Sequence, residues 1–177
     1  MNFKKLEITG FKSFSEKTNF LIENGLTGIV GPNGCGKSNI VESLRWCMGE
    51  NSAKSMRGSG MEDVIFSGTS NSPSKNISEV ALTLDNKNKE GSAQYKEFDE
   101  ISIRRKIEKD KGSKYYINDK EVRARDVQTF FADMSTGAHS PSLISQGRIG
   151  QLVTAKPIER KSILEEAAGI SGIHARR

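Results

Sequence analysis

The sequence predicts an α/β fold for three reasons. Apolar residues recur with helical spacing over 37–48, and Gly49 follows as a helix stop. A short apolar run at 26–30 leads into the glycine-rich segment before this helix. Polar and apolar residues alternate over 77–84, as they do in a half-buried strand. Strand, glycine-rich turn and helix in this order form an α/β unit, to which the later strands add an antiparallel lobe.

The segment before the glycine-rich turn is expected to consist of strands. Residues 5–9 alternate in polarity, and Gly10 ends this strand. Residues 18–22 form the second strand, and the sequence Glu-Asn-Gly at 23–25 predicts a hairpin turn. Residues 26–30 are then short and apolar, so we expect a buried strand that runs directly into the turn.

The segment after the helix is expected to form a β-meander followed by helices. In chain order we expect a loop at 51–60, a strand at 64–66, a loop at 67–75, strands at 77–84, 101–107 and 114–117 with turns at 110–112 and 118–120, a helix at 125–134, a strand end at 142–145, a helical turn at 149–153 and a helix at 157–168. Pro157 suits the first position of the last of these helices.

The composition indicates one globular domain in a reducing compartment. The chain has 177 residues, of which 34% are hydrophobic and 28% are charged. A core of this size needs neither disulfides nor a structural metal. Its two cysteines, Cys35 and Cys47, make no disulfide framework. The N-terminal residues resemble no signal peptide, and no apolar run approaches a membrane span, so we expect a cytoplasmic protein without a membrane partner.

The net charge of +5 is compatible with binding to a polyanion. Lysine and arginine side chains displace condensed counterions from phosphates, which favours such binding. A soluble protein that is merely rich in lysine would have the same charge. Charge alone therefore does not identify a nucleic-acid partner.

The glycine-rich segment has the P-loop pattern G-x-x-x-x-G-K-S/T at every fixed position, in the residues Gly31, Pro32, Asn33, Gly34, Cys35, Gly36, Lys37 and Ser38. Glycines let main-chain amides approach phosphate oxygens, and the following helix directs its positive end at them. Lys37 would contact the β- and γ-phosphates, and the Ser38 hydroxyl would bind Mg²⁺. We therefore predict a site for a purine nucleoside triphosphate, namely ATP with Mg²⁺.

Several further stretches resemble the N-terminal head segment of bacterial structural maintenance of chromosomes (SMC) proteins. The matching stretches are 6–14, 31–46, 56–58, 61–68, 144–148 and 160–172. The resemblance implies a P-loop NTPase with the fold of an ABC-type ATPase head. It places the N-terminal half of this head at 1–168 and the start of a coiled-coil arm at 169–177. The sequence would then stop before the long coiled coil of the family.

The resemblance also implies catalytic roles for two residues. Gln146 matches the Q-loop glutamine, whose amide oxygen would reach Mg²⁺ and the attacking water. Arg57 matches the arginine finger, which would neutralise charge on the γ-phosphate. The residues themselves leave plainer alternatives open, namely a loop glutamine bonded to the backbone and a solvated surface arginine.

Four more residues are expected near the nucleotide. By resemblance, Asn39 follows the phosphate loop, Lys12 and Ser13 lie near the phosphates and sugar, and Asp63 belongs to the segment that borders the base. Without the resemblance, Lys12 would be an ordinary surface lysine. In the same way, Asp63 would be the cap of a helix or strand.

The sequence lacks two motifs that complete the ATP site in this family. It contains neither a Leu-Ser-Gly-Gly signature nor four apolar residues that end in Asp-Glu. In the family, a C-terminal head segment and a second head supply them, so ATP joins two heads. The chain alone is expected to bind ATP weakly, to hydrolyse it hardly at all, and to expose apolar surface where the other half would pack.

The implied function is the ATP-binding half of a chromosome condensation and segregation ATPase. ATP would drive head engagement on DNA, and hydrolysis would release it. The implied partners are the C-terminal head segment, a second SMC head in a homodimer, a kleisin subunit and double-stranded DNA without sequence preference, in a nucleoid-associated cytoplasmic protein. Three alternatives stay open, namely a non-enzymatic nucleotide-binding module, an ABC transporter subunit and a small-molecule kinase.

Overall fold

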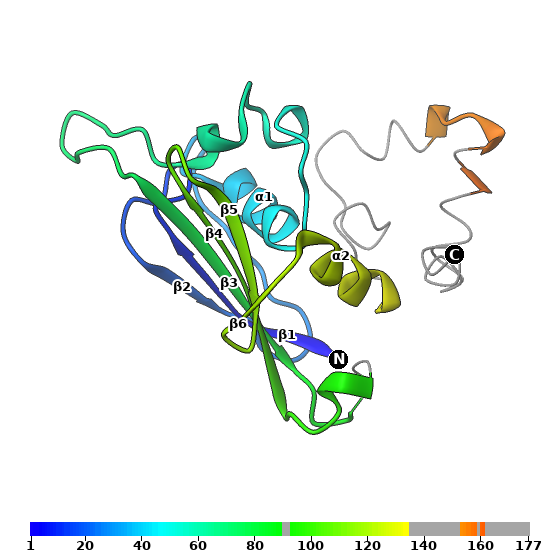
Figure 1. The fold of residues 1–177 in the computed structure, drawn as a ribbon. Helices are drawn as coiled ribbons and strands as arrows, with labels where there is room; N and C mark the ends of the chain where they lie inside the picture. The colour runs from blue at the N-terminus through cyan, green and yellow to red at the C-terminus, as the bar shows by residue number, and fades with distance from the viewer. Residues whose placement is uncertain (90–92, 135–152, 159, 162–177) are drawn as a thin grey trace.

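A computed structural model describes residues 1–89, 93–134, 153–158 and 160–161. Six strands form one antiparallel sheet in the order β2-β1-β3-β4-β5-β6. The strands are β1 (Asn2–Thr9), β2 (Thr18–Leu21), β3 (Ile77–Asp85), β4 (Glu100–Glu108), β5 (Gly112–Ile117) and β6 (Lys120–Val122). Two α-helices, α1 (Lys37–Cys47) and α2 (Ala124–Asp133), lie on the same side of this sheet (Figure 1). Three short 3₁₀ helices are η1 (Lys54–Met56), η2 (Met61–Val64) and η3 (Ala93–Tyr95).

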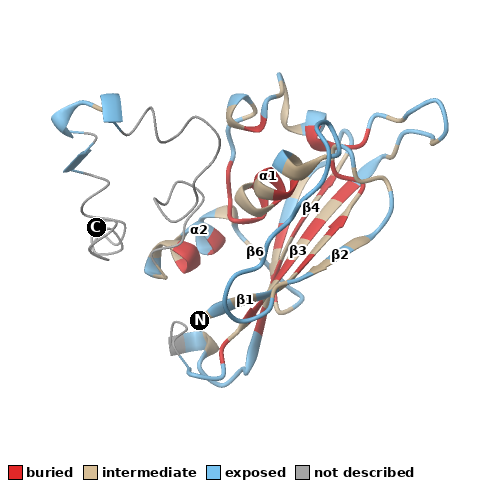
Figure 2. Cartoon of the chain, turned by 180° about the vertical axis from the view of Figure 1, so that it is seen from behind, coloured by how far each residue is buried: buried red, intermediate tan, exposed pale blue. Residues whose placement is uncertain are grey.

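The pairing register gathers the apolar side chains on the face that the helices cover. Leu6 of β1 lies opposite Leu82 of β3, and Ile8 lies opposite Val80. Because side chains alternate along a strand, this register turns the whole apolar set of each strand to one face. Figure 2 shows the result as buried and intermediate residues that alternate along the strands. The expected strands at 5–9, 18–22, 77–84, 101–107 and 114–117 are therefore confirmed, with ends shifted by a few residues.

Helix α1 is fixed to the sheet by its C-terminal half. Trp46 and Cys47 are fully buried, and the Trp46 ring packs against Phe11 with centroids 5.4 Å apart. The Cys47 sulfur lies 3.4 Å from the Ile103 carbonyl oxygen and 3.6 Å from that of Val80. The helix predicted at 37–48 is thus confirmed, and its C-terminal end contacts β3 and β4 through Cys47.

Helix α2 closes the same core over β5. Its apolar residues Val127, Phe130 and Phe131 are buried, as the helical spacing at 125–134 predicts. Gln128 donates a side-chain hydrogen bond to the carbonyl of Gly49, at 2.8 Å. Gly49 has φ +100°, and a Cβ there would meet Gln128 at 2.6 Å. Only glycine therefore suits this junction between the end of α1 and α2.

A buried arginine occupies the centre of the core. Arg105 of β4 is 2% exposed and stacks between Trp46 and Tyr115, with 4.5 Å and 4.7 Å from its guanidinium carbon to the ring centroids. It donates to the carbonyls of Trp46 and Glu50 at 2.8 Å and 2.6 Å. Burial lowers the pKa of Arg105. The guanidinium therefore satisfies the last carbonyls of α1 and the turn that follows it.

Two predicted strands, at 26–30 and 64–66, are wrong, and one short strand was missed. Residues 26–30 are irregular, with Leu26 and Val30 almost fully exposed. A strand needs neighbours for its amides and carbonyls, and no described strand flanks this segment. At the expected strand 64–66, η2 runs through Val64, and Ile65 makes only an isolated bridge to Phe11. The sequence did not predict strand β6, because three residues are too few to show the alternation of polar and apolar residues that marks a strand.

The expected elements at 142–145, 149–153 and 157–168 fall wholly or largely outside the described residues, as does the arm expected at 169–177. In the part of the chain that the structure describes, no helix has both the length and the apolarity that a bilayer crossing requires.

Candidate nucleotide-binding site

The phosphate loop lies between β2 and α1, and two of its glycines have left-handed backbone conformations. Gly34 and Gly36 have φ values of +82° and +94°, in the left-handed region that side chains rarely adopt. A Cβ on Gly36 would also lie 2.5 Å from the Ser13 hydroxyl oxygen. The loop thus turns into α1 at a point where only glycine fits, directly beside the Lys12-Ser13 segment.

Lys37 bends back over its own loop. Its ammonium donates to the carbonyl oxygens of Gly31 and Pro32, both at 2.5 Å, and lies 3.8 Å from the Cys35 sulfur. The first turn of α1 contains no acidic residue, so nothing on the helix cancels the positive end of its dipole. An anion at this helix end would meet the ammonium, the unneutralised dipole and the loop amides together.

Among the described residues, Ser38 is the predicted ligand of a magnesium ion bound with a triphosphate. The described residues contain no group of three or more His, Cys, Asp or Glu side chains that could bind a metal ion. Ser38 is exposed at the start of α1, and a hydroxyl there is a suitable oxygen ligand. Gln146, the other predicted magnesium ligand, lies outside the described residues.

Asn39 links two of the predicted residues that are distant in sequence. Its amide nitrogen donates to the Ser13 hydroxyl at 2.8 Å, and its amide oxygen accepts from Arg57 Nη2 at 2.9 Å. Ser13, Asn39 and Arg57 thus form one hydrogen-bonded row beside the phosphate loop. The row brings together three of the residues that the resemblance assigns to the nucleotide site.

Lys12 and Arg57 converge on a residue that the sequence analysis missed, Glu42. One carboxylate oxygen of Glu42 pairs with Lys12, and the other pairs with Arg57 Nε. Glu42 lies on α1 one turn beyond Ser38, so the helical spacing from Ser38 was a signal that could have found it. Both cations have positive φ, +47° for Lys12 and +55° for Arg57.

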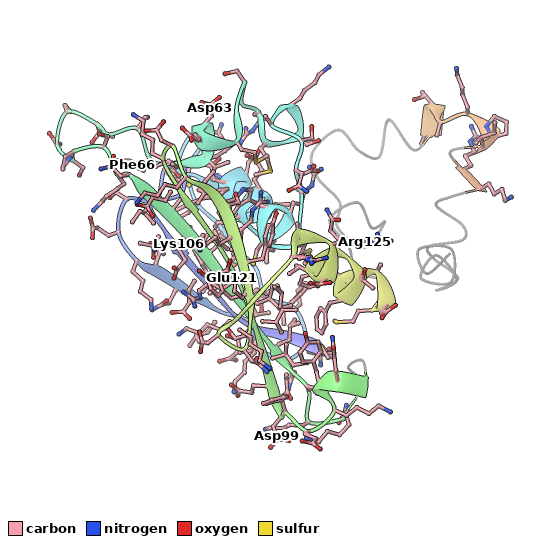
Figure 3. The ribbon with its side chains drawn as sticks, viewed as in Figure 1. Asp63, Phe66, Asp99, Lys106, Glu121 and Arg125 are labelled. Atoms are coloured by element: carbon pink, nitrogen blue, oxygen red, sulfur yellow. The ribbon has the colours of Figure 1, made fainter. Side chains whose placement is uncertain are left out.

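Asp63 is engaged in its own loop. Its carboxylate accepts from the amides of Ser59 and Gly60, at 2.6 Å and 2.9 Å, and from the Ser59 hydroxyl at 2.9 Å. These hydrogen bonds, that of the Gly60 amide first, hold the pKa of Asp63 below its ordinary value. Figure 3 shows Asp63 at the opposite end of the sheet from Asp99. In this structure Asp63 acts as a cap that orders the segment after Arg57.

The two cysteines differ sharply in accessibility. Cys35 is exposed in the phosphate loop, whereas Cys47 is buried, and burial raises its pKa to about 12. Iodoacetamide at pH 8 is therefore expected to alkylate Cys35 and to leave Cys47 intact, because only a reachable thiolate reacts. Mass spectrometry of peptides checks this, and denaturant should expose both thiols. Equal native labelling of the two would contradict the packing of α1.

Comparison with known proteins agrees with this geometry. Residues 2–147 match the family model described as "RecF/RecN/SMC N terminal domain". The chain is 57% identical over 177 residues to a protein named "Chromosome partition protein Smc" from Cereibacter sphaeroides, and it spans 15% of that relative's length.

Solved structures match the fold as well. A chain described under "Structural biochemistry of ATP-driven dimerization and DNA stimulated activation of SMC ATPases" superimposes with a TM-score of 0.80 at 31% identity, over 94% of this chain and 99% of that one. A Pyrococcus furiosus Smc head with an extended coiled coil, bound to the C-terminal domain of ScpA, gives 0.87 at 31% identity, over 98% and 43%. The chain therefore belongs to the RecF/RecN/SMC N-terminal domain family and has the fold of an SMC ATPase head.

Proposed function

We propose that this chain is the ATP-binding half of a chromosome-organising ATPase head. The observation that supports it most is the phosphate loop, where Lys37 bridges two loop carbonyls at the positive end of α1. On binding, the Lys37 ammonium would exchange these carbonyls for β- and γ-phosphate oxygens, and main-chain amides of 31–36 would donate to the same phosphates. Bound Mg²⁺ would neutralise phosphate charge, with the Ser38 hydroxyl as its protein ligand.

The remaining roles follow the same geometry. Arg57 would act as the arginine finger, since its side chain is 58% exposed and is held by hydrogen bonds beside the loop. Gln146 would orient the attacking water, and Lys12 with Ser13 would border the phosphates and sugar. Asp63 would shape the segment beside the base through its capping hydrogen bonds. Hydrolysis would also require groups that another polypeptide segment supplies.

The exposed segment 26–30 supports a partner that completes the head. Leu26 and Val30 are exposed at 101% and 95%, although their apolar side chains would gain from burial. Exposed apolar side chains thus occur in a segment that the sequence predicts as a strand, and this supports the proposal that another head segment packs there. A C-terminal head segment that offers strand edges would cover it, and 26–30 would then become a strand beside new neighbours.

The other proposed partners follow from the relatives. One solved relative is described by ATP-driven dimerization and another is bound to ScpA, so a second head and a kleisin are proposed for this chain. The net charge of +5 is compatible with double-stranded DNA as a sequence-independent partner, within a cytoplasmic, nucleoid-associated assembly. DNA contact through the phosphate backbone would weaken steeply as salt rises.

The test is to mix this chain with the C-terminal head segment of the same protein and to titrate Mg-ATP by calorimetry. We expect saturable binding and ATP turnover by the mixture, and hardly any turnover by the chain alone. Mg-ATP should also slow alkylation of Cys35, since the triphosphate would cover the loop. A mixture that is folded and associated but takes up no Mg-ATP would refute the proposal.

A further inference from the structure

Glu42 is a buried carboxylate that the proposed phosphate and magnesium contacts do not use. Its side chain is 11% exposed, on the face of α1 that looks toward the Lys12 and Arg57 loops. A buried carboxylate is costly unless it is paired, and here each of its oxygens meets a cation. Glu42 therefore holds two loops together that are separated by more than forty positions in the sequence.

The contacts of Glu42 close a ring around Arg57. Lys12, which pairs with one Glu42 oxygen, also donates to the carbonyl of Met56, the residue before Arg57. Met56 is itself buried. The Lys12 ammonium thus fixes the main chain that carries Arg57, while Glu42 fixes the Arg57 side chain at Nε.

The same ring leaves one end of the guanidinium available. Nε is taken by Glu42 and Nη2 by the Asn39 amide oxygen at 2.9 Å. Among the described residues, Nη1 has no partner, so both of its N–H donors can meet an anion, whereas Nη2 has one N–H left. A planar guanidinium with two of its three nitrogens anchored has a set orientation, which a single anchor would not give.

The backbone conformations of Lys12 and Arg57 also indicate that this arrangement is held in place by its contacts. Lys12 and Arg57 both have left-handed φ values, at +47° and +55°, which are uncommon for residues with side chains. Such conformations persist where surrounding contacts over-determine them, and they cluster at functional sites. Here both residues make their ion pair to the same carboxylate.

We propose that Glu42 is a positioning residue for Arg57: it presets the guanidinium so that Nη1 faces the γ-phosphate. The inference rests on the proposed function, in which Arg57 meets that phosphate. In this proposal Glu42 would contact neither nucleotide nor metal and would act through Arg57, directly at Nε and indirectly through Lys12 and Met56. An arginine oriented in advance does not have to be ordered when charge develops on the phosphate.

The test uses E42Q in this chain, combined with the C-terminal head segment. Turnover at saturating ATP is expected to fall at least about tenfold, because a neutral amide presents an NH₂ group to one of the two cations. The Kd for Mg-ATP is expected to change by less than about twofold, because Lys37 and the loop amides are intact. E42D keeps the charge on a shorter stem and should restore part of the lost turnover.

Two further variants separate positioning from a general effect of losing a charge. In an Arg57→Ala background, E42Q should cause no additional loss of turnover, because the residue it positions is gone. Glu7→Gln is the matched control, since Glu7 is also held by two cations, Lys5 and Lys17, but lies on the opposite face of the sheet. It should leave turnover within about twofold of the unchanged protein.

Each outcome decides between the two proposals. If the unchanged pair does not bind Mg-ATP, the proposed function fails, and this inference fails with it. If the unchanged pair turns ATP over and E42Q matches it, or if the losses from E42Q and Arg57→Ala multiply, Glu42 does not position Arg57. If E42Q does not fold, E42D is tested in its place. The proposal then expects E42D to lower turnover relative to the unchanged protein, to leave the Kd for Mg-ATP unchanged, and to have no effect in the Arg57→Ala background.

Discussion

Lys37→Ala is expected to remove measurable Mg-ATP binding from the head completed with its C-terminal segment. The ammonium that donates at 2.5 Å to the Gly31 and Pro32 carbonyls is the charge that would meet the phosphates. Charge-assisted hydrogen bonds contribute about 1.5–3 kcal/mol each, so losing two of them weakens binding by roughly a hundredfold or more. Calorimetric titration of the variant against the unchanged protein measures this effect.

The loss should be confined to binding. The Lys37 contacts are on an exposed loop, where water can replace the ammonium at both carbonyls, so the thermal midpoint should move little. Lys120→Ala, which removes an exposed lysine from β6, is the matched control for net charge. Retained affinity in Lys37→Ala, or an equal loss in Lys120→Ala, would show that the loop is not the phosphate site.

Arg105→Ala is expected to destabilise the fold by about 3–5 kcal/mol, the range for truncating a large buried side chain to alanine. The substitution removes a side chain stacked between Trp46 and Tyr115, together with its hydrogen bonds to the carbonyls of Trp46 and Glu50. The loss of these buried hydrogen bonds adds to the cost of the cavity. Urea unfolding of the chain, followed by Trp46 fluorescence, measures the change in the free energy of unfolding.

Arg104→Met on the same strand provides the comparison. Arg104 lies on the opposite face of the sheet, over Tyr116, and pairs with Glu79 and Asp119 with its side chain 28% exposed. Partly exposed ion pairs contribute at most about 1 kcal/mol, so this variant should cost little. Arg105→Met should fall between the two, because it keeps volume but loses every donor. If Arg104→Met and Arg105→Ala lower the free energy of unfolding equally, the buried arginine does not stabilise the core more than the partly exposed one does.

The sheet and the helices could be predicted from the sequence because each element has one buried apolar face and one more exposed, polar face. Strand β3 alternates in burial from Ser78 to Leu84, and a two-residue period follows directly from that. Helix α1 could be predicted because its apolar residues recur with helical spacing on the face that packs on the sheet, and because the phosphate motif marks where it begins. The motif residues themselves were predicted from spacing alone, and in the structure Gly34 and Gly36 of this motif have left-handed φ values.

Two kinds of feature could not be predicted in this way. The apolar run 26–30 predicts burial, but burial depends on strands that the described residues do not provide. The charged residues Glu42 and Arg105 are buried against their usual preference, because partners distant in sequence compensate them. At Arg105 there was one signal: it occupies the inward position between Ile103 and Ile107. Periodicity shows which face a side chain takes, but not what it meets there.

Helix α1 is buried more deeply at its C-terminal end than in its first turn. Trp46 and Cys47 are sunk into the sheet, whereas Ser38 lies exposed at the tip. Because the first turn of this eleven-residue helix is more exposed than its last turn, local opening of the first turn should cost less free energy. A ligand bound at the first turn would oppose that opening, so occupancy of the loop would stiffen the N-terminal end of α1 without any displacement of the β-sheet.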